Sequence, residues 1–108
     1  SGYFHVYSGI IKLENAKQSG ISAQQKQILL SDARMNFEVG IGIFNKIDHP
    51  QVKALAFEGI GNVLKQQKEQ GWQHRTFSYH SFAQNLLEEY ELAPDHQVLL
   101  ESSINALM

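Results

Sequence analysis

Four glycines in two pairs constrain the fold of this chain more than any other feature. One pair is Gly40 and Gly42, the other is Gly59 and Gly61, and each lies in an apolar segment with helical spacing. A glycine inside a helix costs about 1 kcal/mol relative to alanine, so we expect these positions to let helices approach closely. Only a short turn separates the two segments. Residues 33–64 therefore predict a packed helical hairpin that organises the rest of the chain.

The chain of 108 residues predicts an all-α fold of about five antiparallel helices. Only two prolines occur, and both fall where a helix is expected to begin. Ser22 and Gln25 have the spacing of a capping box, and Gly20 suits the left-handed position after a helix end. The expected helices cover residues 3–17, 23 to about 47, 50 to about 70, about 74 to 92, and 94–107.

The second helix carries two apolar stripes, which predicts a central helix packed on both flanks. One stripe consists of Leu30, Ala33, Phe37, Ile41 and Phe44, and the other of Ile28, Met35, Val39 and Ile43. Asp48 is the preferred cap of the third helix and His49 is the alternative.

Composition narrows the class of protein. The chain has no cysteine, which excludes disulfides and thiolate metal sites and fits a cytoplasmic location. It has no apolar run long enough to span a membrane. The net charge of −2 argues against nucleic acid as a partner. Residues 1–75 carry +3 and residues 76–108 carry −5, so the acidic part is either a solvated face or a surface for a basic partner. We expect residues 1–108 to form a single domain, which either stands alone or is excised from a longer protein.

The same hairpin resembles the tetratricopeptide repeat. Ala33, Phe37 and Gly40 resemble the second helix of such a repeat, and Phe57, Ile60, Gly61 and Leu64 resemble the first helix of the next one. Residues 43–50 look like the connection between repeats in longer-repeat members of the family. The resemblance implies a right-handed array of helical hairpins. Gly9 and Gly61 lie 52 residues apart, where a regular array has about 34, so the array would be irregular. An unrelated five-helix bundle is the alternative.

The family is mostly a protein-interaction scaffold, so the resemblance implies a protein or peptide partner, self-association included. The implied groove-facing positions are Leu55, Glu58, Asn62 and Lys65. Helical periodicity alone also places the last three on one polar face. A plain solvent-facing stripe is the competing interpretation.

Aromatic residues are abundant in the expected first and fourth helices, and Tyr and Trp are favoured anchors at interfaces. We select Tyr3, Trp72 and Phe77 as candidate partner-binding residues, against the alternative that each lies in the core. If aromatic residues enclose a small ligand or peptide signal instead, the chain is a sensing or regulatory domain.

No catalytic, cofactor-binding or metal-binding residue is expected. His74 and His80 fall on different faces of a helix and are poor joint metal ligands. Ser78 and His80 lack the glycine-flanked elbow of a serine nucleophile. The sequence thus predicts a non-enzymatic interaction module without a cofactor.

Overall fold

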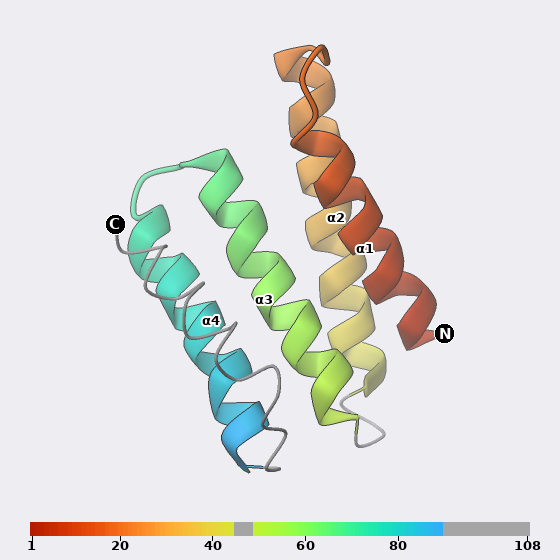
Figure 1. The fold of residues 1–108 in the computed structure, drawn as a ribbon, viewed down its shortest axis with the longest axis vertical. Helices are drawn as coiled ribbons and strands as arrows, with labels where there is room; N and C mark the ends of the chain where they lie inside the picture. Colours follow the sequence, from red (N-terminus) through yellow and green to blue (C-terminus); the bar gives the residue numbers. More distant parts are fainter. Residues whose placement is uncertain (45–48, 90–108) are drawn as a thin grey trace.

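A computed structural model describes residues 1–44 and 49–89, which form four α-helices (Figure 1). The helices are α1 (Gly2–Ala16), α2 (Ala23–Phe44), α3 (Pro50–Gln67) and α4 (Trp72–Glu89). The described residues contain no strand, so the all-α prediction is confirmed for this part of the chain. The fifth helix, predicted over residues 94–107, lies outside the described residues.

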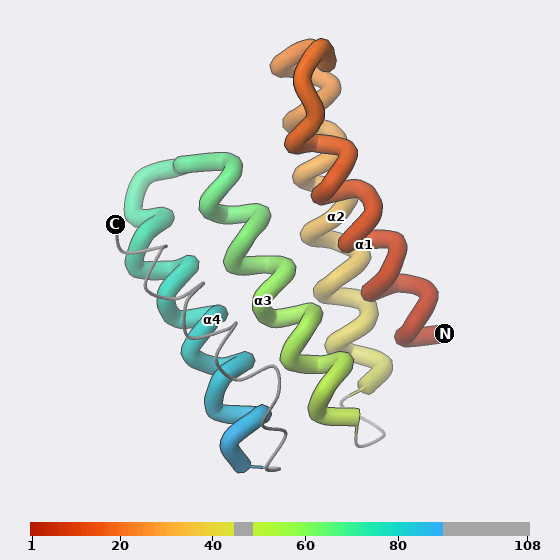
Figure 2. The backbone as a smooth tube through the Cα atoms, in the orientation of Figure 1, coloured from red at the N-terminus to blue at the C-terminus, as the bar shows by residue number. Residues whose placement is uncertain are grey.

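The helices form two antiparallel hairpins, α1–α2 and α3–α4 (Figure 2). α1 and α3 run in the same direction, and α2 and α4 run in the opposite one. α3 packs against α1, α2 and α4, whereas α2 packs against α1 and α3. The third helix therefore packs against all three of the other described helices.

The second apolar stripe of α2 is not a packing surface. Ile28, Met35 and Val39 are all exposed, and Ile43 is only half-buried. The other stripe supplies the buried residues Leu30, Ala33, Phe37 and Phe44, and Gly40 is buried beside them. The prediction of a helix covered on both stripes is wrong, because both neighbours of α2 approach it over the same broad face.

Local capping follows the sequence closely in the first hairpin. The Ser22 hydroxyl accepts a hydrogen bond from the Gln25 N–H at 3.0 Å, which confirms the serine half of the capping box. Gly20 has a φ of +92°, as expected for a residue after a helix end.

The boundaries of α3 and α4 differ from the prediction. His49 holds the N-cap position of α3, without a side-chain cap hydrogen bond, so the preference for Asp48 is wrong. α3 ends at Gln67 because Lys68 adopts the left-handed conformation, with φ 53° and ψ 38°. Its N–H still bonds to the Leu64 carbonyl at 3.0 Å. α4 begins directly after Gly71, which has a φ of +78°.

The centre of the core is one aromatic ring between two glycines. Phe37 of α2 is fully buried. A Cβ atom placed on Gly9 of α1 would lie 2.8 Å from the Phe37 ring, and one on Gly59 of α3 would overlap the same ring. Side chains at either glycine would collide with the ring, so the two glycines allow α1 and α3 to close on α2 together.

Three of the four paired glycines are close-packing positions, as predicted. A Cβ on Gly40 would lie 2.6 Å from Val6, and one on Gly61 would lie 2.7 Å from the buried His80 ring. Gly42 is different, because it is exposed and a Cβ there would meet nothing within 4 Å. The prediction is wrong for Gly42 because that position points to solvent.

The two hairpins repeat one packing pattern. In each, a small residue of the first helix packs against a larger side chain of the second: Gly9 against Phe37, and Gly61 against His80. Gly9 and Gly61 are 52 residues apart, while Phe37 and His80 are 43 apart. The same offsets relate a second set of positions. Gly2 packs against Phe44 in the first hairpin, and Ala54 shares a buried cluster with Leu87 in the second. We refer to this correspondence between the two described hairpins as the internal repeat.

Candidate functional site

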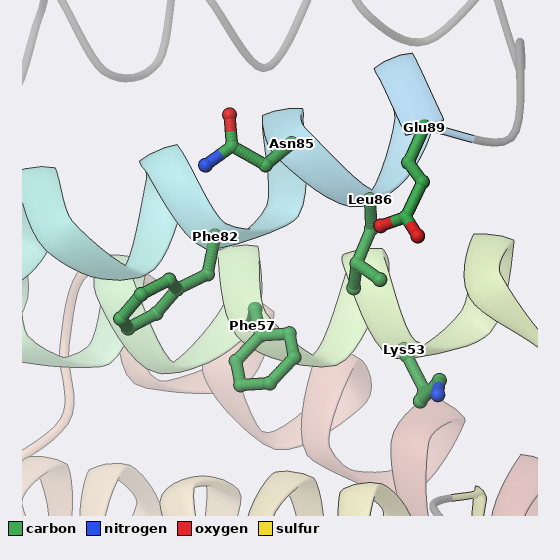
Figure 3. A pocket seen from close by; sticks show the side chains of 6 residues that line it. All are labelled: Lys53, Phe57, Phe82, Asn85, Leu86 and Glu89. Carbon is green, nitrogen blue, oxygen red and sulfur yellow. The ribbon is translucent and has the colours of Figure 1, made fainter.

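The candidate site is a hollow on one side of the α3–α4 hairpin (Figure 3). We name it the α3–α4 hollow, and its volume is about 300 Å³. Its lining residues are Lys53, Phe57, Phe82, Asn85, Leu86 and Glu89. Phe82 and Leu86 extend from α4 toward α3 and Phe57 lies over α3, whereas Lys53 and Glu89 lie towards one end.

Helical spacing places these residues together. Lys53 and Phe57 are four residues apart on α3, and Phe82 and Leu86 are four apart on α4. Residues at this spacing lie on the same side of a helix. Because the two helices pack in an antiparallel hairpin, these two rows face the same side of the pair and form the walls of the hollow.

The two aromatic rings that line the hollow, Phe57 and Phe82, pack against each other and against a third ring, Tyr79. Phe57 and Tyr79 have ring centroids 6.4 Å apart, Phe57 and Phe82 are 5.9 Å apart, and Tyr79 and Phe82 are 6.2 Å apart. Phe57 of α3 contacts both rings of α4 across the helix pair, at separations typical of aromatic pairs. Even so, 52% of Phe82 is exposed. An apolar group entering the hollow would therefore cover surface that water now contacts.

The rim of the hollow carries both signs of charge at one end. Lys53 lies in the first turn of α3 and Glu89 is the last described residue of α4. The positive end of the α3 dipole adds to the charge of the lysine. The two positions lie at the same end of the hairpin because the helices are antiparallel. A ligand at this end meets a cation and an anion on opposite walls.

The residues predicted to line a groove on the third helix do not line this hollow. Leu55, Glu58, Asn62 and Lys65 are all half-buried on α3. Successive residues of a helix are separated by about 100°, which places Asn62 about 140° around the axis from Phe57. The predicted stripe and the α3–α4 hollow are thus two different surfaces of the same helix.

The three predicted aromatic anchors do not form one patch. Tyr3 is exposed at the start of α1, Phe77 is exposed on α4, and Trp72 is half-buried at the start of α4. The starts of α1 and α4 lie on opposite sides of the helix array (Figure 1). Tyr3 also has a structural role, because its hydroxyl lies 3.1 Å from His49 Nδ1 and its ring packs edge-on against Phe44.

The sequence did not single out Phe57, Phe82 and Leu86 as lining residues of a hollow. Their apolar character and spacing match those of buried residues. What distinguishes them is the distance between α3 and α4 at that point, which depends on the small residues Ala54 and Ala83 at the buried contact. The only sequence feature that could have indicated a hollow was the presence of Lys53 and Glu89 on the same helix sides as the apolar lining residues.

The described helices give no support to a metal site or a membrane span. Residues 1–44 and 49–89 hold no group of three or more His, Cys, Asp or Glu side chains that could bind a metal ion. None of the four described helices is long and apolar enough to cross a membrane. Comparison with known proteins gave no match to a family model, to a curated protein or to a solved structure.

Proposed function

We propose that this chain is a non-catalytic helical-repeat module that binds a protein or peptide segment in the α3–α4 hollow. The observation that carries the proposal is the half-exposed aromatic ring of Phe82 in a concave site lined by Phe57 and Leu86. Concave apolar surface with a few polar groups at its edge is typical of binding sites. The absence of cysteine is consistent with a cytoplasmic setting for this module.

The repeat of two hairpins supports the same proposal. Stacked helical hairpins present extended surfaces on which partners bind. The parallel direction of α1 and α3, and their contact with each other, agree with a tetratricopeptide-like order of helices. We include this arrangement in the proposal.

The dimensions and charges of the hollow suggest what binds. A volume of about 300 Å³ suits one or two apolar side chains and falls at the lower limit of small-molecule sites. We propose an apolar anchor residue followed closely by charged residues, a cation for Glu89 and an anion for Lys53. Burying one large apolar side chain contributes about 1.5–3 kcal/mol, which corresponds to roughly a ten- to hundredfold gain in affinity.

Selection from a displayed library of random peptides, each about 16 residues long, tests the proposal. We expect enriched peptides to share an apolar residue flanked by charged residues. Fluorescence anisotropy should show that Phe82→Ala weakens their binding about tenfold or more. Phe77→Ala is the matched control, because Phe77 is exposed on the same helix but does not line the hollow. Binding that survives Phe82→Ala but is lost in Asn62→Ala or Lys65→Ala would move the site to the predicted polar stripe.

A small-ligand sensing domain is the second candidate. The rings of Phe57 and Phe82 favour it, since two rings that line a hollow can contact a flat apolar molecule. A thermal-shift screen of aromatic and aliphatic small molecules separates the two functions. A compound that raises the melting temperature of the native chain, but not of Phe82→Ala, supports the sensing function.

A further inference from the structure

The outer edge of α1 carries three large apolar residues that no described helix covers. Phe4 is 67% exposed, Tyr7 is 49% exposed and Ile11 is 61% exposed. They follow one another at helical spacings of three and four residues, so they form a continuous stripe. We name these three residues the α1 stripe.

The internal repeat shows what kind of surface the stripe is. Subtracting the 52-residue offset from positions of α3 relates Ala56 to Phe4, Gly59 to Tyr7 and Val63 to Ile11. All three α3 residues are buried. Gly59 is the position that packs against Phe37 of α2, and Ala56 and Val63 belong to the same core cluster as that ring. The equivalent edge of α3 is therefore occupied by the preceding helix.

The α1 stripe therefore corresponds to the edge of α3 on which α2 packs, but no described helix packs on the stripe. Its own neighbours in the described part of the chain are α2 and α3, which pack on the other sides. The side chains on the edge also differ from those of α3. Where α3 has small residues that receive a ring, α1 has rings and an isoleucine that project from the surface. A partner must accept these projecting side chains.

From this geometry we infer that the α1 stripe is a self-association surface on which α1 of a second copy of this chain packs antiparallel. The stripe is self-complementary, because Tyr7 is its middle residue. A two-fold axis between positions 7 and 8, beside Tyr7, places Phe4 of one copy against Ile11 of the other. Such an interface, in which one patch meets itself, is the commonest kind in homo-oligomers.

The charges on α1 fit a second copy. Residues 2–11 contain no Lys, Arg, Asp or Glu, so two copies meet there without like-charge repulsion. Glu14 lies in the last turn of α1, two turns beyond Tyr7 on a neighbouring line of the helix surface. Glu14 pairs with Lys17 of its own chain at 3.4 Å. In the antiparallel dimer its carboxylate also faces the positive N-terminal end of the other α1, which favours this direction over the parallel one.

Single-cysteine variants test the arrangement cleanly, because the chain has no cysteine of its own. Residues on a two-fold axis approach within disulfide distance. In oxidised glutathione, Tyr7→Cys should form a covalent dimer about ten times faster than Met35→Cys, or more. Met35 is the matched control, because it is 64% exposed on α2 and lies off the α1 stripe. Equal slow rates for the two variants would indicate random collision and would overturn the inference.

Sedimentation equilibrium of the native chain supplies the second measurement. We expect a dimer whose dissociation constant rises about tenfold or more in Ile11→Glu and stays unchanged in Met35→Glu, with circular dichroism showing that both variants remain folded. Phe82→Ala should leave dimerisation intact, so this inference and the binding function of the α3–α4 hollow succeed or fail separately. A native chain that stays monomeric up to several hundred micromolar overturns it, and the α1 stripe then belongs to a helix of another chain or a preceding segment.

Discussion

Phe37 and Phe82 both lie on the second helix of a hairpin, and their surroundings differ completely. Phe37 is enclosed by Gly9 and Gly59, so three helices close around it. Phe82 meets other rings, Phe57 and Tyr79, and remains half exposed. A ring opposite a glycine completes a packed interior, whereas a ring opposite a ring keeps the helices' edges apart and leaves a hollow. The first arrangement gives stability, and the second gives a surface that can bind.

The largest expected difference in stability is between substitutions of Phe37 and of Phe82. Phe37→Ala should lower the free energy of unfolding by about 3–5 kcal/mol, because it leaves a cavity where three helices meet. Phe82→Ala should lower it by less than about 1 kcal/mol, because the ring already contacts water. Urea unfolding followed by circular dichroism measures both. Similar losses of unfolding free energy in the two variants would show that Phe82 contributes as much to stability as Phe37 does.

The glycines opposite Phe37 give the next effect. Gly59→Ala should destabilise the chain by about 1–3 kcal/mol, because the new methyl group must displace the buried ring. Gly42→Ala is the matched control in the exposed part of α2, and it should stabilise the chain by up to about 1 kcal/mol through helix propensity. If both substitutions stabilise, the helices around Phe37 can separate enough to admit a methyl group.

A substitution of the buried residue Thr76 in the second hairpin should have a smaller effect, and it should raise the stability. The Thr76 hydroxyl is fully buried on α4 without a hydrogen-bond partner. Thr76→Val keeps the shape and removes the cost of burying that group, so it should stabilise the chain by about 1 kcal/mol. The thermal midpoint measures this. A clear loss of stability would mean that the hydroxyl is satisfied in solution by a water molecule.

The smallest effect concerns the solvent-facing side of α2. Arg34 and Glu38 form an ion pair at 2.8 Å with four-residue helical spacing. Glu38→Gln should cost less than about 0.5 kcal/mol, and the difference should vanish in about 1 M NaCl because salt screens exposed charges. A larger cost that persists in salt would assign the pair a role in holding α2 against α3.

The sequence allowed prediction of the four described helices and of several of their tight contacts. Gly40, Gly59 and Gly61 indicated close approach correctly, because a glycine inside a helix lowers its stability unless close packing compensates. Ile28, Met35 and Val39 led to the wrong prediction that α2 is covered on a second side. Apolar residues at helical spacing form the same pattern whether they are covered or exposed. The end of α3 was also misplaced. Lys68 adopts the left-handed conformation, which is usually found at glycine, and no nearby residue type predicts it.

The candidate site was less accessible to sequence reasoning. Phe57 and Phe82 were identified as apolar positions of their helices, but whether two apolar rows meet or leave a space depends on the separation of the helix axes. That separation is set by residues at a different place, Ala54 and Ala83, which pack at the contact between α3 and α4. Patterns along one helix do not contain this information, so the hollow emerged only from the assembled hairpin.

The position of Phe37 also bears on how this sequence can change through evolution. Gly9 and Gly59 are far apart in the chain, yet both are limited by the same ring. A larger residue at either glycine becomes acceptable only after Phe37 has become smaller, and a smaller residue at position 37 then leaves a gap that either glycine position could fill. Substitutions at these three positions are therefore expected to depend on one another, and their order of appearance should matter.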